Sequence, residues 1–224
     1  MTAVVLNLQD LDDLEQLAPD LCFGDSERRE ALLENGTRDF NAVPGSGKTS
    51  LLAAKLLLLA NKWPHTHKGI CILSHTNVAR EEITHRLAKS VEGSRLLAYP
   101  HFIGTIHGFV NQFLAMAMLR KLEIKVDVID DTVFAKRAMS LVLSNQYFTL
   151  RAWLKRQPNA EALLTGLYYK NHRLEVQSEG GKLPGADSTS YKQLLTLKNT
   201  LADEGVFRYR DMFAYAELAL VEQP

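Results

Sequence analysis

The stretch Ala42-Val43-Pro44-Gly45-Ser46-Gly47-Lys48-Thr49 decides the fold, because it fits the phosphate-binding loop pattern with alanine at the first glycine position. Gly45 and Gly47 let the backbone curl so that successive N–H groups point at phosphate oxygens, and the following helix adds its positive N-terminal end. Lys48 can reach the β- and γ-phosphates, and the Thr49 hydroxyl can ligate Mg²⁺. The alternative is a glycine turn before an ordinary helix, but the flanking elements favour a nucleoside-triphosphate site at residues 42–49.

Strand and helix patterns alternate on both sides of this loop. Residues 38–43 indicate a short strand with Phe40 and Ala42 alternating, and residues 50–61 indicate a strong apolar helix. Further patterns indicate, in chain order, helices at 10–17 and 26–34, a strand buried on both faces at 69–74 (GICILS), a helix at 77–90, a strand at 101–106 and a helix at 108–120. Strands that alternate with helices predict a parallel α/β sheet up to about residue 110.

The character of the chain changes after this part. Residues 132–200 have helix-like apolar spacing, loop residues at Pro158 and at 180–185, and little strand signal. Between residues 151 and 200, eight Lys and Arg stand against four Asp and Glu, a local net charge of +4. We therefore predict a second, helical subdomain with a basic surface.

Composition sets the class of protein. The chain has 224 residues, 46% hydrophobic and 23% charged, with a formal net charge of zero, which is typical of a globular domain. Residues 1–35 carry nine acids and two bases, a net charge of −7, so the remaining 189 residues carry +7 and suit an anionic ligand. A solvated acidic helix before an average domain explains this distribution equally well.

Cys22 and Cys71 make no disulfide framework, so we expect a reduced, cytoplasmic setting. The longest apolar run is far shorter than the ~20 residues that a membrane span needs.

Small polar residues follow the strand at 69–74. Residues 72–83 (ILSHTNVAREEI) run from a strand into a helix, and Thr76 and Asn77 lie where open α/β sheets bind ligands. Both side chains can donate to a phosphodiester backbone. Either residue can also simply cap the helix, and from the sequence alone the cap is the preferred interpretation.

A histidine and an aromatic residue follow the next strand, in residues 102–109 (FIGTIHGF). His107 and Phe109 can contact or stack on splayed bases. A structural histidine is an equally good interpretation of His107. Phe109 and Phe113, four residues apart, also fit a buried aromatic pair on a helix, which is the interpretation we prefer for Phe113.

The order and spacing of these segments resemble motifs I, Ia and Ib of the UvrD/Rep-like DNA helicases of superfamily 1. Lys48 precedes Thr76 by 28 residues and His107 by 59, spacings that look right for that family. Residues 205–215 (GVFRYRDMFAY) look like the family segment that leads back into the motor sheet. Within the family, the segments PGSGKT, GICILSHTNVAREEI and YPHFIGTIHGFVN are most similar to the helicase-like subunit of Gabija-type antiphage systems, which partners an OLD-family nuclease.

The resemblance implies an α/β fold with a partial P-loop NTPase parallel sheet, the RecA-like motor domain 1, and an inserted helical subdomain. The first part of the motor domain would occupy residues 1–110, the helical insertion residues 111–204, and a return segment residues 205–224. That segment would stop before the Walker B strand. The chain would then be the N-terminal, ATP-binding part of the motor.

The resemblance also implies a function. Lys48 and Thr49 would bind ATP and Mg²⁺. The residues that would line the path of single-stranded DNA are Thr76, Asn77, Thr105 and His107. A complete protein of this kind would be an ATP-dependent DNA helicase that translocates on single-stranded DNA in antiviral defence, with an OLD-family nuclease as partner and no membrane contact.

The sequence departs from the family pattern in three places. Residues 26–30 (SERRE) lack the glutamine with which the family reads adenine, and Ile106 stands where motif Ib usually has an aromatic residue. Hydrolysis needs an acidic pair that holds Mg²⁺ and orients water, and the family places this pair just after the segment that ends here at Pro224. Asp130 and Asp131 imitate the pair, but their position matches a loop and helix start in the family, with Asp130 or Asp131 as the helix cap. We therefore expect the chain alone to be inactive.

Two other functions remain open. A P-loop kinase or GTPase would use Asp130 and Asp131 as its second acidic site, whereas a non-catalytic module would bind DNA or a nuclease subunit through a vestigial loop. His65 and His67 lie near Cys71, but no further ligands with metal spacing follow, so we assign no metal beyond Mg²⁺.

Overall fold

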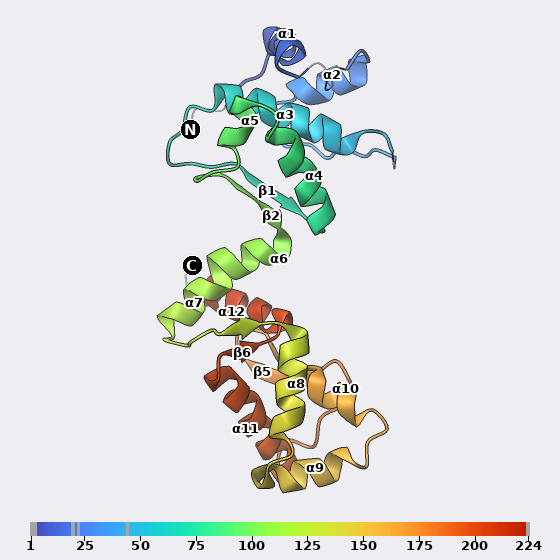
Figure 1. Ribbon diagram of the computed structural model, residues 1–224, viewed down its shortest axis with the longest axis vertical. Coiled ribbons are helices and arrows are strands. Elements are labelled where there is room, and N and C mark those ends of the chain that lie inside the picture. The colour runs from blue at the N-terminus through green and yellow to red at the C-terminus, as the bar shows by residue number, and fades with distance from the viewer. Residues whose placement is uncertain (1–3, 19–20, 22, 44, 223–224) are drawn as a thin grey trace. The chain divides into compact units, whose positions relative to one another are not determined.

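The computed structural model describes residues 4–18, 21, 23–43 and 45–222. The chain divides after Ile106 into two compact units (Figure 1), unit 1 with residues 1–106 and unit 2 with residues 107–224. Each unit has a hydrophobic core of its own. The assignment of residues 111–204 to an insertion and of residues 205–224 to a return segment stays a prediction.

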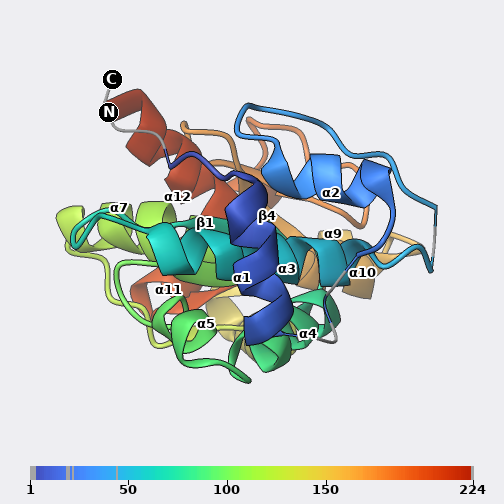
Figure 2. The same cartoon turned by 90° about the horizontal axis from the view of Figure 1, so that it is seen from above.

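Unit 1 is built around one long helix. Its elements are, in chain order, α1 (Leu8–Leu17), α2 (Ser26–Leu33), α3 (Lys48–Lys62), β1 (Cys71–Ser74), α4 (Asn77–Leu87), α5 (Val91–Arg95) and β2 (Phe102–Thr105). Buried residues occur on several sides of α3, among them Ala53 and Ala54, which have no exposed surface. Because α3 is apolar around much of its circumference, α1, α2, α4 and α5 all pack on it. Figure 2 shows α1 lying across α3.

The two strands of unit 1 pair in parallel. Ile72 lies opposite Ile103, and Ser74 lies opposite Thr105 at the carboxyl ends of both strands. Between the two strands the chain passes through α4 and α5, which is the strand–helix–strand connection that parallel pairing requires. The predicted parallel α/β arrangement of this region is confirmed.

Two strand predictions in unit 1 are wrong. Residues 38–43 form no strand, because within the described part of the chain β1 and β2 pair only with each other and a strand needs a neighbour for its N–H and C=O groups. Phe40 on this segment is 58% exposed. The expectation that residues 69–74 are buried on both faces also fails, because Ile72 is buried whereas Leu73 is 45% exposed. Only one face of β1 is covered.

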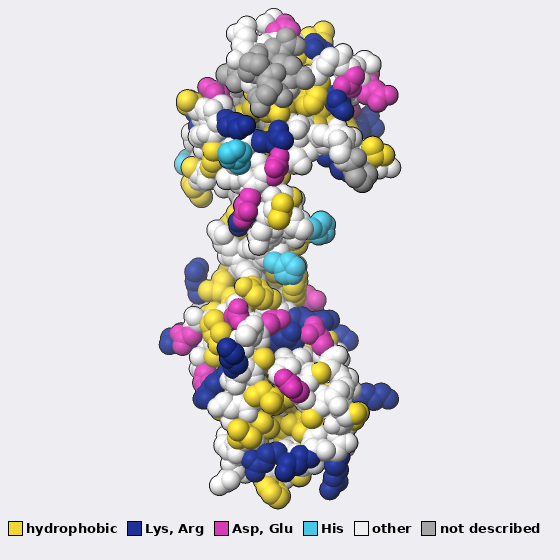
Figure 3. All heavy atoms as spheres, turned by 45° about the vertical axis from the view of Figure 1, so that its right-hand side comes forward, with side chains coloured by type: hydrophobic (Ala, Val, Ile, Leu, Met, Phe, Trp, Pro, Cys, Tyr) yellow, Lys and Arg dark blue, Asp and Glu magenta, His cyan; other side chains and the backbone are white. Residues whose placement is uncertain are grey.

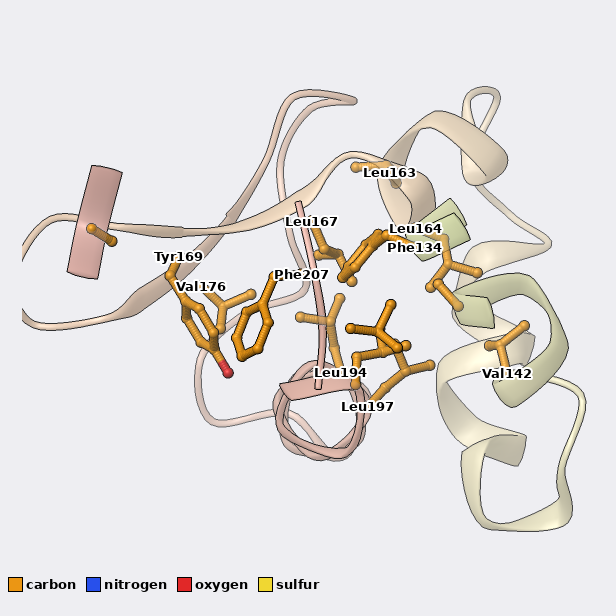
Figure 4. Packing of buried hydrophobic residues seen from close by; sticks show 14 of the residues in the cluster. Phe134, Val142, Leu163, Leu164, Leu167, Tyr169, Val176, Leu194, Leu197 and Phe207 are labelled. Atoms are coloured by element: carbon orange, nitrogen blue, oxygen red, sulfur yellow. The ribbon is translucent and has the colours of Figure 1, made fainter. Parts of the chain in front are cut away.

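Unit 2 begins with a continuous helical run and continues as a mixture of helices and short strands. Its elements are α6 (Ile106–Phe109), the π-helical η2 (Val110–Ala115), α7 (Met116–Lys121), β3 (Val128–Ile129), α8 (Asp131–Leu141), the 3-10 helix η3 (Asn145–Tyr147), α9 (Phe148–Leu154), α10 (Ala160–Thr165), β4 (Leu167–Lys170), β5 (Glu175–Ser178), α11 (Thr189–Asp203), β6 (Val206–Phe207) and α12 (Tyr209–Glu222). Aliphatic and aromatic side chains from α8, α10, α11 and the strands point toward one another in its core (Figure 4), with Phe134 and Phe207 fully buried.

The strands of unit 2 form two separate pairs. β3 and β6 pair in parallel, and β4 and β5 form an antiparallel hairpin with Tyr169 opposite Val176. The hairpin contradicts the prediction of little strand structure in residues 132–200. Its strands have only four residues each, and its turn places Asn171 and Leu174 at φ of 55° and 53°, without the Asn-Gly or Asp-Gly pair that makes hairpins visible in a sequence.

Two side-chain predictions have opposite outcomes. The Oδ1 atom of Asp130 accepts the N–H groups of Thr132 and Val133 at 2.8 and 2.9 Å, which confirms Asp130 as the cap of α8. The rings of Phe109 and Phe113 do meet, with centroids 5.0 Å apart, but Phe113 is 45% exposed. The prediction of a buried pair is wrong for Phe113, because it lies in the π-helical stretch, whose wider turn changes the side on which successive residues lie.

A buried ion pair lies in the core of unit 2. The Nζ atom of Lys198 is 2.6 Å from Oδ2 of Asp211, and neither side chain has exposed surface. The same Nζ atom lies 4.5 Å from the ring centroids of Phe134 and Tyr169. Asp211 also accepts the N–H groups of Tyr169 at 2.7 Å and Arg208 at 2.9 Å. Asp211 thereby links the backbone of β4 to the residue just before α12.

None of the helices in the described ranges is both long enough and apolar enough to cross a membrane.

Candidate functional site

The phosphate-loop residues form a tight turn that leads directly into α3. Gly45 and Gly47 have φ of 80° and 83°, a left-handed conformation that costs a residue with a side chain about 1–2 kcal/mol. The N–H group of Ser46 donates to the carbonyl of Val43 at 3.2 Å. Gly47 is the N-cap of α3, which begins at Lys48. Pro44, which belongs to the predicted loop, lies outside the described residues.

Two polar side chains of the loop, Lys48 and Ser46, can donate to a ligand. The ammonium group of Lys48 is exposed and donates to the carbonyl of Ala42 at the start of the same loop. The hydroxyl of Ser46 is buried without a hydrogen-bond partner in the structure, although buried polar groups are nearly always paired. Thr49 lies half-buried in the first turn of α3. The loop therefore has donors that an anionic ligand would satisfy.

The loop opens onto a pocket of about 880 Å³ in unit 1, within the size range of small-molecule and cofactor sites. One wall is α2 with the residue before it, and the other is the first half of α3. The residues that line it are Asp25, Glu27, Arg28, Ala31, Phe40, Asn41, Ala42, Val43, Ser46, Gly47, Lys48, Leu51, Leu52 and Lys55. The predicted residues Ala42, Val43, Ser46, Gly47 and Lys48 thus share one cavity. The contribution of α2 was not predicted.

The other predicted residues of unit 1 lie at the ends of its strands. The Oγ1 atom of Thr76 accepts the N–H group of Ala79 at 3.2 Å, so Thr76 is the N-cap of α4 and the preferred cap interpretation is confirmed. Asn77 is exposed in the first turn of that helix. Thr105 ends β2 opposite Ser74 of β1. Thr76, Asn77 and Thr105 therefore lie at or just past the carboxyl ends of two adjacent parallel strands, where open α/β sheets bind ligands.

His107 lies in a pocket of unit 2 with a volume of about 610 Å³. Its ring meets the ring of Phe213 edge to face, with centroids 5.2 Å apart. Tyr209 and Phe213 are one helical turn apart on α12, and they are 48% and 37% exposed. His107, Tyr209 and Phe213 form what we call the aromatic strip. Partly exposed rings of this kind are suited to stacking on bases.

An arginine network lies in the same pocket. The Nη2 atom of Arg208 lies 2.9 Å from Asp131 and 3.0 Å from Glu179, and the Nη1 atom of Arg210 lies 2.5 Å from Glu179. The guanidinium of Arg210 also lies 4.1 Å above the ring of Tyr168. The hydrogen bond from Arg210, joined by that from Arg208, holds the pKa of Glu179 below its usual range. The Nε and Nη1 atoms of Arg208 are buried and have no hydrogen-bond partner among the residues that the structure describes.

The network and the strip come from distant parts of unit 2, and sequence reasoning singled out only His107 and Asp131 among them. The alternation of aromatic and basic residues in 207–210 (FRYR) is a signal that could have pointed to this site, but it was not used to predict the site. On the face shown in Figure 3, Lys and Arg side chains are interspersed with Asp and Glu in both units. In the unit 2 pocket, Asp131 and Glu179 form ion pairs with the arginines.

No group of three His, Cys, Asp or Glu side chains within the described ranges could hold a metal ion. Asp130 is engaged as a helix cap, and Asp131 pairs with Arg208 and accepts the N–H group of Tyr209 at 3.1 Å. The second acidic site that a P-loop kinase or GTPase would need therefore finds no support in these two residues.

Comparison with known proteins identifies the family of the chain. The chain matches the family described as UvrD/REP helicase N-terminal domain over residues 24–220. No curated protein matches the chain significantly. The matched range includes both pockets, and UvrD-type helicases are ATP-dependent DNA helicases that generally use Mg²⁺. The chain belongs to the UvrD/REP helicase family, whose N-terminal domain it matches.

Proposed function

We propose that residues 42–49 bind ATP with Mg²⁺ and that the chain is the N-terminal, ATP-binding part of a helicase that translocates on single-stranded DNA. The observation that carries the proposal is the loop itself. It combines two left-handed glycines, an exposed lysine and a buried hydroxyl without a partner at the mouth of a nucleotide-sized pocket. Family membership supports the proposal independently.

Each loop residue has a role in this proposal. Lys48 exchanges the carbonyl of Ala42 for a β- or γ-phosphate oxygen, which is a stronger, charge-assisted partner. The backbone N–H groups from Gly45 to Lys48 and the start of α3 favour negative charge. Thr49 holds Mg²⁺ through its hydroxyl. When bound, Mg²⁺-ATP supplies the phosphoryl group whose transfer to water would drive movement in the complete motor.

The nucleic-acid role is assigned to two groups of residues, one in each unit. Thr76, Asn77 and Thr105 lie at or just past the strand ends of unit 1, where hydroxyl and amide groups can donate to phosphates. In unit 2, the aromatic strip of His107, Tyr209 and Phe213 offers ring faces and edges to bases. The strip extends the prediction for His107 by two residues.

We also propose that the chain alone binds nucleotide without turning it over. Hydrolysis requires an acidic pair and arginines that stabilise the developing charge. Asp130 and Asp131 are occupied by a helix cap and by an ion pair. The closer likeness to Gabija-type helicase-like subunits, a nuclease partner, a defence role and a cytoplasmic location rest on the sequence resemblance alone.

The test of the nucleotide site is binding of a fluorescent ATP analogue with Mg²⁺ to the full chain. We expect Lys48→Ala to weaken binding at least tenfold, and Lys68→Ala, which removes the same charge from an exposed position outside the pocket, to leave it unchanged. Equal binding by both variants would remove the phosphate-site assignment. Lys48-dependent hydrolysis by the chain alone, with or without single-stranded DNA, would contradict the proposed inactivity.

The test of the nucleic-acid site is binding of a labelled oligothymidine. Tyr209→Ala removes one ring of the aromatic strip, and we expect it to weaken binding by about 1–3 kcal/mol, the range for one stacked base. Tyr99→Ala, which removes an 86% exposed ring in unit 1, is the matched control. If both variants bind as the unchanged chain does, the aromatic strip is not a base platform.

A further inference from the structure

Helix α2 carries an arginine that contacts the phosphate loop across 18 positions of sequence. The Nη2 atom of Arg28 donates to the carbonyl oxygen of Ser46 at 2.9 Å. Its Nη1 atom lies 3.2 Å from Oδ2 of Asp25, and its guanidinium lies 5.6 Å from the ring centroid of Phe23. Arg28 lines the nucleotide pocket, and its side chain is 44% exposed. It is the contact that links α2 directly to the loop backbone.

Helix α2 is capped at its N-terminal end and is hydrogen-bonded to α3 near its C-terminal end. Asp25 caps the helix by accepting the N–H group of Arg28 at 2.9 Å. At the other end, the Nζ atom of Lys55 on α3 donates to the carbonyls of Leu32, at 2.7 Å, and Glu34. Burial lowers the pKa of Lys55, while the negative charge of Glu34 opposes that shift. Movement of Arg28 relative to α3 is therefore restricted.

The bonded carbonyl belongs to the peptide unit between Ser46 and Gly47. A trans peptide is planar, with its C=O and N–H groups on opposite sides, so fixing the Ser46 carbonyl also fixes the N–H group of Gly47. Gly45 and Gly47 leave the loop backbone unusually free, and ordering such residues is entropically unfavourable. A side chain that holds this peptide in the absence of nucleotide lowers the ordering penalty of binding.

We propose that Arg28 is a positioning residue of the phosphate loop, which holds the Ser46–Gly47 peptide so that the loop receives the phosphates of any nucleoside triphosphate without reading the base. The inference rests on the proposed function of residues 42–49. The inference gives a role to residues 26–30, the segment that lacks the adenine-reading glutamine of the family.

The experiment is competition for a bound fluorescent ATP analogue in the full chain, with ATP, GTP and inorganic tripolyphosphate as competitors. For Arg28→Ala we expect the affinity of all three competitors to fall by the same factor, about tenfold, which is near the lower end for one hydrogen bond from a charged group. Arg28→Lys keeps a cationic donor and restores part of the loss. Arg38→Ala, which removes the same charge from an exposed ion pair with Glu34 that does not line the pocket, is the matched control.

A second measurement reports on the loop without any ligand. Hydrogen exchange of residues 45–48 in the empty chain should quicken in Arg28→Ala and stay unchanged in Arg38→Ala. Unchanged affinity and exchange in Arg28→Ala would overturn the proposal. So would a loss confined to ATP and GTP with tripolyphosphate unaffected, because that result would make Arg28 a base or sugar contact. Lys48→Ala distinguishes failure of this inference from failure of the proposed function. If nucleotide binding depends on Lys48 but not on Arg28, residues 42–49 remain the proposed nucleotide site and only the role of Arg28 is wrong.

Discussion

The buried ion pair between Lys198 and Asp211 gives the sharpest stability prediction. We consider Lys198→Met, which keeps a long side chain against the rings of Phe134 and Tyr169 but removes the charge. The variant leaves the carboxylate of Asp211 without exposed surface and with only two backbone N–H partners. Burial lowers the pKa of Lys198, and the nearby Asp211 carboxylate opposes that shift.

The magnitude follows from the burial of both groups. Removing one partner of a buried pair costs about 3–5 kcal/mol, because an uncompensated charge stays behind. The two backbone N–H donors that remain on Asp211 place Lys198→Met near the lower end, at about 3 kcal/mol. Asp211→Asn leaves the ammonium of Lys198 among aromatic rings and falls in the same range. For a domain with a total stability of about 5–15 kcal/mol, either loss is large.

The assay is urea denaturation of the full chain, followed by circular dichroism. The double variant Lys198→Met with Asp211→Asn removes both charges, so we expect it to be destabilised by less than the sum of the single variants. A Lys198→Met chain within about 1 kcal/mol of the unchanged chain would refute the reasoning, because that is the range of exposed ion pairs. Additive single variants would show that the two charges do not interact.

Two further predictions concern carboxylates of unit 2. Glu179→Gln removes the charge that pairs with Arg208 and Arg210, so we expect a labelled single-stranded oligonucleotide to bind more tightly. The slope of log affinity against log salt concentration should become steeper by about 0.7 for each extra phosphate contact. Glu175→Gln on β5 is the control, and equal affinities of the two variants would contradict the prediction. The hydrogen bonds of Arg137 hold the pKa of Glu204 below its ordinary value of 4.5. This carboxylate therefore stabilises the fold above pH 4.5, and that contribution is lost as pH falls through the lowered pKa. The difference in unfolding free energy between the unchanged chain and Glu204→Gln should therefore be present at pH 7 and vanish on acidification, and a difference that stays constant would be inconsistent with linkage.

Local signals in the sequence predicted much of unit 1. Ser50 to Ala60 is apolar enough to indicate helix α3 without any tertiary information, and the glycines of the phosphate loop are required by their left-handed φ values. Thr76 was correctly interpreted as a cap. The strand at residues 38–43 was predicted from local alternation alone. Strand formation depends on a neighbour, and no local pattern contains that information.

The sequence predicted less of unit 2, because its pocket depends on long-range contacts. Asp131 and Arg208 are 77 positions apart, and Glu179 and Arg210 are 31 apart. The hairpin of β4 and β5 brings Glu179 and Tyr168 to the arginines, and that hairpin was not predicted. Charge counting gave residues 151–200 a net +4, but Lys198 is fully buried and paired, so the count overestimates the charge available at the surface.

Both pockets contain an arginine that pairs with a carboxylate in the absence of ligand. In unit 1, Arg28 pairs with Asp25 and still donates to the loop carbonyl. In unit 2, Arg208 is buried between Asp131 and Glu179, with two donors that have no partner. An exposed ion pair contributes little to stability, and a buried ion pair is weak evidence of a stabilising role. A contribution to stability therefore does not explain either arrangement.

Orientation of the arginine explains both arrangements better. A carboxylate fixes the planar guanidinium and lowers the entropy that would be lost when an anionic ligand binds. An anionic ligand also competes with the carboxylate that already pairs with the arginine, and it must bind the arginine more strongly than that carboxylate does. Affinity of the unit 2 pocket for an anionic ligand should therefore respond more to removal of the carboxylate at Glu179 than to removal of an exposed lysine of unit 2 outside that pocket.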